Sequence, residues 1–119
     1  MSTSLETFIA KIKEGRPVAF KETIDAIGQY YDYRPTRFLN GSDDDRVINE
    51  PGCNEGSCKI FYFGRLHGLS EKETLALFGE HYADVLSNPS GESHKNIRTF
   101  MSCGWPGISF DGEALVRRS

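Results

Sequence analysis

No stretch of this 119-residue sequence approaches the run of about 18 apolar residues that a membrane-spanning helix requires. The first ten residues also lack the basic start and the long apolar core of a signal peptide. No internal repeat, linker or low-complexity segment divides the chain. We therefore expect one domain over residues 1–119, in the cytoplasm of the producing cell and without a membrane partner.

Basic residues are also few, with 14 Lys and Arg against 17 Asp and Glu and a net charge of −3. They are scattered among acidic residues, whereas a nucleic-acid-binding protein usually carries a basic patch or stripe. A short acidic run at 43–45 strengthens this contrast. The composition therefore predicts that nucleic acid is not a partner.

Cysteine is scarce and odd in number: Cys53, Cys58 and Cys103. A secreted disulfide scaffold normally carries an even set, so three thiols indicate a reducing compartment. A zinc site built from these thiols and one histidine lacks the close Cys-x-x-Cys pair of such sites. We therefore expect no metal and no cofactor, and a chain that folds as a monomer on its apolar residues alone.

Aromatic residues are plentiful, with 8 Phe and 5 Tyr, and apolar residues recur at helical spacing. This periodicity, with breaking residues, predicts five helices over about 5–14, 20–32, 57–67, 70–87 and 93–103. Ser93 is the expected N-cap of the last helix, and Ser70 and Glu73 are expected to form a capping box at the start of the fourth. Short extended segments at 36–40 and 46–49 predict a hairpin around a polar turn at 41–45, and 108–110 alternates as a third strand. Residues 117–119 are expected to be a frayed tail. The predicted fold class is α+β, with about five helices and a small two- or three-stranded antiparallel sheet.

Four ordered blocks of residues then suggest a family. They read Asn-x-Gly-Ser-Cys-Lys-Ile-Phe at 54–61, Leu-Ser, Thr-Leu, Phe-Gly and Tyr within 69–82, His-x-Asn-Ile-Arg-x-Phe-Met at 94–101, and Gly-Trp-x-Gly-Ile-x-Phe at 104–110. In this order and spacing the chain resembles the HopJ type III effector family from about Leu5 to Leu115. The resemblance implies a bacterial effector with a role in virulence, delivered into a host cell by a type III secretion system.

The resemblance brings no catalytic residues with it, and the chain departs from it in two places. Type III substrates usually begin with a long, Ser-rich leader, whereas the first predicted helix begins by about Leu5. The acidic turn at 43–45 also makes the hairpin longer than the family's usual one. A domain that binds a ligand inside the bacterium and is never secreted therefore stays open as an alternative.

The sharpest enzymatic hypothesis rests on Cys58. The Gly56-Ser57-Cys58 sequence places this thiol at the predicted start of a helix, where the helix dipole lowers the pKa of a cysteine. A base would have to come from His94, which lies 36 residues later in the sequence. A small thiol-dependent enzyme is therefore the alternative to a protein that acts by binding, through a surface or groove, and we favour binding.

The binding hypothesis centres on the helix entry at 54–59. Glycines let the backbone approach a ligand closely, and a helix start leaves N–H groups free to bind an anion. Three residues from the later blocks could complete such a site, and the candidate set is Asn54, Gly56, Ser57, Cys58, Lys59, His94, Arg98 and Trp105.

Each candidate also has a purely structural interpretation. Ser57 would cap the helix, Trp105 would fill the core, and His94 and Arg98 would flank a solvated edge. The expected partner is a host or bacterial protein, or a small anionic ligand.

Overall fold

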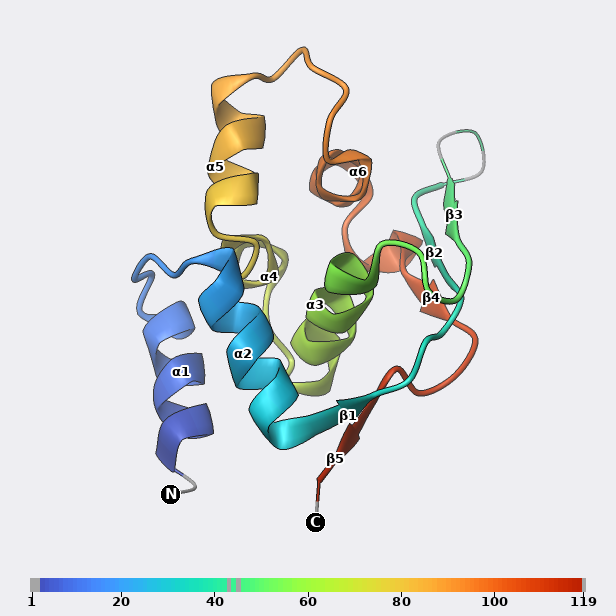
Figure 1. The fold of residues 1–119 in the computed structure, drawn as a ribbon. Helices are drawn as coiled ribbons and strands as arrows, with labels where there is room; N and C mark the ends of the chain where they lie inside the picture. Colours follow the sequence, from blue (N-terminus) through green and yellow to red (C-terminus); the bar gives the residue numbers. More distant parts are fainter. Residues whose placement is uncertain (1–2, 43, 45, 119) are drawn as a thin grey trace.

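The computed structural model describes residues 3–42, 44 and 46–118. In this part of the chain six α-helices, one 3-10 turn and five short strands are present (Figure 1). The helices are α1 (Thr3–Lys13), α2 (Phe20–Tyr30), α3 (Glu55–Leu66), α4 (Glu71–Ala76), α5 (Glu80–Ser87) and α6 (Lys95–Cys103). The strands are β1 (Tyr31–Tyr33), β2 (Phe38–Asn40), β3 (Val47–Asn49), β4 (Ser109–Phe110) and β5 (Leu115–Arg117), with the 3-10 turn η1 at Trp105–Gly107. This confirms the predicted α+β class.

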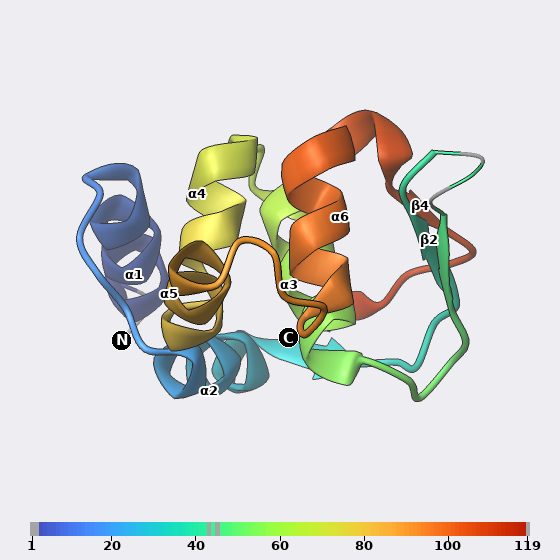
Figure 2. The same ribbon diagram turned by 90° about the horizontal axis from the view of Figure 1, so that it is seen from above.

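The strands form two small antiparallel sheets. In the three-stranded sheet β2 lies between β3 and β4, with Phe38 opposite both Asn49 and Phe110. The predicted hairpin and third strand are therefore confirmed, although positions 43 and 45 of its turn lie outside the described residues. This sheet stands at one end of the molecule and α1 at the other (Figure 2).

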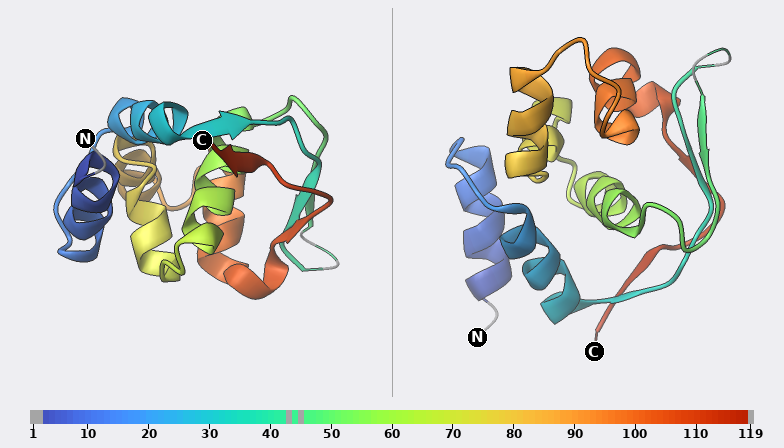
Figure 3. Two further views of the ribbon diagram at one scale, coloured as in Figure 1. Left: turned by 90° about the horizontal axis from the view of Figure 1, so that it is seen from below. Right: turned by 45° about the horizontal axis from the view of Figure 1, so that its top comes forward.

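The second sheet, β1 with β5, was not predicted. Tyr31 was expected to continue α2 but adopts an extended conformation and pairs with Arg117. The expected frayed tail is wrong for Arg117 and Arg118, because Arg117 lies in β5 and the Arg118 N–H donates to the Tyr30 carbonyl over 3.0 Å. Position 119 lies outside the described residues. The left view of Figure 3 shows β1 (cyan) and β5 (dark red) side by side.

Aromatic rings dominate the core, as their number predicts. Phe61 lies at its centre and contacts the rings of Phe38, Phe78 and Phe100. Its neighbour in α3, Phe63, is fully buried against α1 and β1. The amphipathic face of α3 therefore determines how the other elements pack around it. None of the helices in the described ranges has the length and apolar character to cross a membrane.

The single helix expected over about 70–87 is in fact two. Its start is as predicted, since Ser70 and Glu73 form a capping box. Gly79, however, separates α4 from α5 with φ = 57°. A Cβ atom there would lie 2.6 Å from both the Phe20 nitrogen and the Val18 oxygen, so only glycine lets the chain entering α2 approach this closely.

The other two helix starts in the C-terminal half are also different from the prediction. Ser57 and Ser93 were expected as N-caps, but α3 starts after Asn54 and α6 after His94. Both N-cap residues are left-handed, with φ of 52° and 54°. Asn and His are among the few non-glycine residue types that are enriched in this conformation.

Candidate functional site

A cavity of about 490 Å³ lies where the first turns of four helices meet. The helices are α2, α3, α5 and α6, and Figure 1 shows α5 and α6 above α2 and α3. The lining residues are the first turns or N-caps of these helices together with two apolar neighbours: Phe20, Val47, Asn54, Gly56, Ser57, Phe78, His81, His94, Lys95, Asn96 and Ile97. We call this space the four-helix cavity.

The N-cap side chains of α3 and α6 do not cap their helices. Asn54 donates its side-chain amide to Asn49 Oδ1 over 2.6 Å, and His94 Nε2 lies 3.2 Å from Asp84 Oδ2. Neither side chain accepts a hydrogen bond from the first turn of its own helix. The first N–H groups of an α-helix have no partner within the helix, so both first turns present free donors at the cavity.

A network of asparagines holds these two helix starts in place. Asn49 in β3 accepts from Asn54 and from Asn96 Nδ2 (2.9 Å), and it donates to Asn96 Oδ1 (3.1 Å). Asn40 in β2 donates to Asn96 Oδ1 over 3.0 Å. Asn40, Asn49 and Asn96 are all buried. The sheet therefore fixes the starts of α3 and α6 relative to each other through buried amides.

Three rings form one side of the cavity. The Phe20 ring meets the His81 ring edge-on at 4.5 Å between centroids, and the His94 ring lies tilted against His81 at 5.0 Å. Gly56 permits this arrangement, because a Cβ atom there would lie 2.8 Å from Phe20 Cζ. All three rings are half-buried. The glycine expected to approach a ligand thus makes room for an aromatic side chain of the cavity wall.

The charges around the cavity are mixed. Lys95 is an exposed cation on its lining, and the helix starts add partial positive charge. Two carboxylates lie beside the cavity and are already engaged. The Phe20 N–H donates to Glu80 Oε1 over 2.8 Å, which lowers the pKa of Glu80, and Asp84 is paired with His94.

The structure brings four of the eight candidate residues together, namely Asn54, Gly56, Ser57 and His94. That they bind a ligand stays a prediction. Sequence reasoning missed Phe20, His81, Lys95 and Asn96. For one of them a signal was present, since Asn96 is a specified residue of the third family block, whereas His81 and Lys95 fall at positions that the blocks leave open.

Cys58 is not on the cavity and is not an activated thiol. Its side chain is 1% exposed, and its Sγ lies 3.6 Å from the Thr36 carbonyl oxygen as a donor. Burial raises the pKa of this thiol to about 11. The expected lowering by the helix dipole is therefore wrong, because removal from water outweighs it.

Lys59 also points elsewhere. Its Nζ lies 4.8 Å from the centre of the Tyr33 ring, as a cation–π contact on the β1 side of α3. Successive helix residues point about 100° apart, so a residue next to a cavity-facing turn need not face the cavity. The cation on the cavity lining is Lys95 in place of Lys59.

Arg98 and Trp105 serve the packing of the chain. Arg98 donates to the carbonyls of Ser93 and Pro89 and so holds the loop before α6. Trp105 donates Nε1 to the Leu69 carbonyl over 3.0 Å, and its ring meets that of Phe100 edge-on. Neither residue lines the four-helix cavity.

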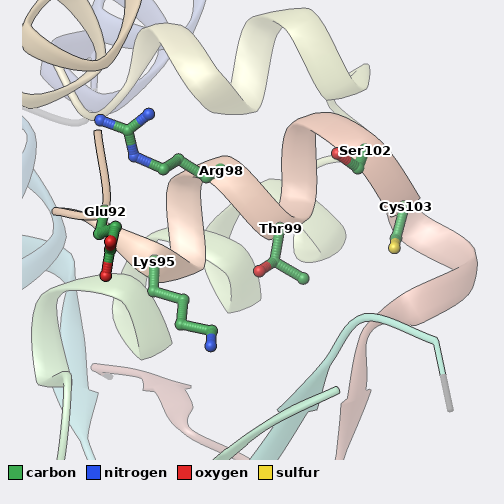
Figure 4. A pocket seen from close by; sticks show the side chains of 6 residues that line it. All are labelled: Glu92, Lys95, Arg98, Thr99, Ser102 and Cys103. Atoms are coloured by element: carbon green, nitrogen blue, oxygen red, sulfur yellow. The ribbon is translucent and has the colours of Figure 1, made fainter. Parts of the chain in front are cut away.

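A second, smaller hollow of about 330 Å³ follows the exposed side of α6. Its side chains come from Glu92, Lys95, Arg98, Thr99, Ser102 and Cys103 (Figure 4). Lys95 and Arg98 point in opposite directions in this view. Within the described residues no group of three or more His, Cys, Asp or Glu side chains is arranged to hold a metal ion.

Comparison with known proteins identifies the family of the chain. Residues 5–115 match the family described as HopJ type III effector protein, so the chain belongs to that family. A solved structure similar to it is the crystal structure of VPA0580, a protein of unknown function. The two chains share 39% identity and superpose with a TM-score of 0.89, over 95% of this chain and 92% of the other. No curated protein matches the chain.

Proposed function

We propose that this HopJ-family protein acts by binding a small anionic ligand in the four-helix cavity, without catalysing a reaction. The observation that carries the proposal is the pair of uncapped helix starts, α3 and α6, which face one cavity because Asn54 and His94 are bonded elsewhere. Free N–H groups and the helix dipole together favour an anion at such a place.

Cavity size and composition support a small molecule. A volume of about 490 Å³ lies in the range of small-molecule sites, which are mostly apolar with a few polar groups that fix orientation. Val47, Phe78 and Ile97 supply the apolar part here, and Ser57 and the two histidines supply the polar part. Burial of Cys58 supports binding over thiol catalysis, since a thiol with a raised pKa is a poor nucleophile at neutral pH.

The experiment is an amide-resolved NMR titration with inorganic phosphate and with acetate. The backbone signals of Gly56, Ser57, Lys95 and Asn96 are expected to shift together and to saturate. The first turn of α4 is an internal control, because the Glu73 N–H already donates to Ser70 Oγ over 3.0 Å. Unshifted amides in α3 and α6 at saturating anion would refute the proposal.

Two lysines form a matched pair for the same titration. Lys95→Gln removes a cation from the cavity lining and is expected to weaken anion binding several-fold, whereas Lys59→Gln removes one that faces Tyr33. Equal weakening by both substitutions would mean that the anion responds only to net charge and that the cavity is not the site.

Membership of the HopJ family further supports delivery of the protein into a host cell by a type III system. The test is a translocation reporter fused to the C-terminal end, compared between a secreting strain and one that lacks the secretion ATPase. A signal in host cells from the first strain alone is expected. Equal signals from both strains would refute delivery by the type III system, and no signal from either would leave a ligand-binding protein that remains inside the bacterium.

A further inference from the structure

The outer strand β3 leaves one edge of the three-stranded sheet open. The strand order is β3-β2-β4, so among the described strands β3 has a neighbour on one side only, and Figure 1 shows it at the margin of the molecule. An open strand edge presents a row of unpaired N–H and C=O groups, which is a template for pairing with another strand. The residues along this edge indicate which strand fits it.

The hydrogen-bond pattern of the sheet identifies Ile48 as the residue whose backbone faces the open edge. The Asp111 N–H donates to the Arg37 carbonyl over 3.0 Å, so Arg37 bonds toward β4. Successive residues of a strand bond to opposite sides, and the next residue, Phe38, therefore bonds to its register partner Asn49 in β3. By the same alternation Ile48 turns its N–H and its carbonyl away from β2.

The outer face of this edge carries one apolar side chain between two opposite charges. Arg46, Ile48 and Glu50 are all exposed, whereas Asn49 between the last two is 1% exposed. Ile48, at 55%, is the most exposed large apolar side chain among the described residues. The Glu50 side chain is 62% exposed although Arg37 Nε lies 3.5 Å from its Oε2, so its carboxylate is accessible to a second cation.

We propose that β3 pairs antiparallel with β3 of a second copy of this chain, with Ile48 opposite the partner's Ile48. The two isoleucines then exchange both backbone hydrogen bonds across a two-fold axis. Positions two before and two after the centre face each other in this register, so each Arg46 lies opposite the partner's Glu50.

The order of the charges favours this register over the alternatives. A parallel pairing puts Arg46 beside the partner's Arg46, and a shift of two residues puts a charge opposite Ile48. The contact uses the same edge of both copies, so it closes at a dimer. A single short strand pair covers far less than the roughly 800 Å² per partner of a stable complex, so the dimer is transient. Each copy keeps its own core, which agrees with a chain that folds as a monomer.

Sedimentation equilibrium of the full chain, from about 20 µM to 1 mM, tests the pairing directly. The weight-average mass is expected to rise with concentration from 13.4 kDa toward twice that value and no further. A monomer mass throughout this range, or a mass that continues to rise beyond a dimer, overturns the proposal.

Two charge reversals test the register. Arg46→Glu alone and Glu50→Arg alone each place two like-charged pairs across the interface, so each should weaken association at least about tenfold. An equimolar mixture of the two variants has opposite charges at both pairs and is expected to form a heterodimer. The double variant restores both pairs within one chain, and it replaces the mixture if amide spectra show a single variant to be unfolded. A mixture of folded variants that stays monomeric overturns the proposal, as does a monomeric double variant.

A matched pair of serine substitutions separates strand pairing from general stickiness. Ile48→Ser removes the apolar contact at the two-fold axis and should weaken association about tenfold. Leu86→Ser removes a side chain that is equally exposed, at 54%, but lies on α5, and it should leave association unchanged. Equal weakening by both substitutions overturns the proposal.

Discussion

The buried asparagines make unequal contributions to stability, and two substitutions expose the difference. Asn49→Leu removes the acceptor for Asn96 Nδ2, which has no other partner among the described residues. It also removes the donor to Asn96 Oδ1 and the acceptor for Asn54. Asn40→Leu removes only two donated bonds, to the Asn96 carbonyl and to Asn96 Oδ1.

The magnitudes follow from which groups are left without a partner. A buried donor or acceptor that loses its partner costs about 1–3 kcal/mol, and a lost bond whose partner can bond elsewhere costs about 1 kcal/mol. Asn49→Leu leaves the buried Asn96 Nδ2 without a hydrogen-bond partner and should lower the free energy of unfolding by about 3 kcal/mol. Asn40→Leu leaves the Asn96 side-chain oxygen paired, because Asn96 Oδ1 keeps the hydrogen bond from Asn49.

Asn40 in addition carries a buried side-chain oxygen with no partner, which its replacement by leucine removes. The gain offsets the two lost bonds, so Asn40→Leu should change stability by less than about 1 kcal/mol. Urea unfolding with a slope near 1.5 kcal/mol/M would separate the two variants by about 2 M in midpoint. Equal midpoints for the two variants would refute the reasoning that unpaired groups, and not the number of bonds, determine the cost.

Three further tests use five other positions. Gly79→Ala should lower the melting temperature sharply through backbone overlap at positive φ, whereas Gly28→Ala, with open space in α2, should stabilise by about 0.5–1 kcal/mol. Burial and cationic neighbours lower the pKa of His67 from 6.5, so the unfolded chain binds its proton first. Stability to urea should therefore fall as the pH drops below 6.5, and this slope should disappear in His67→Asn. Maleimide at pH 7 should label the exposed Cys53 well before the buried Cys58, with mass spectrometry of the peptides as the readout; equal rates would contradict the raised pKa.

Helical periodicity predicts this fold well where one helix face is buried. Ile12, Ile27 and Phe61 are nearly or fully buried and occupy the stripes that locate α1, α2 and α3. The capping box at Ser70 was readable for the same reason, since it is a local pattern with a local bond. Features that depend only on neighbours in sequence are thus predictable from sequence.

The break at Gly79 and the strand β5 depend on distant partners instead. The apolar spacing continues from Leu75 past Gly79 to Tyr82, so periodicity shows no boundary there. What requires the break is the approach of the chain before α2, about 60 residues earlier. Arg117 likewise becomes a strand residue only because β1 is available beside it. Tertiary context overrides local preference in both cases.

The candidate site has features of both kinds, some determined by neighbours in sequence and others by distant partners. Asn54 and His94 belong to recognisable blocks, but serine looks like the better cap, so their left-handed conformation was not anticipated. That conformation is what frees the first turns, because each side chain turns to a partner outside its own helix. Asn49 is one such partner and also bonds Asn96. The same buried amide thus specifies the fold and aligns two helix starts on one cavity, which explains how residues 40 positions apart in sequence form one site.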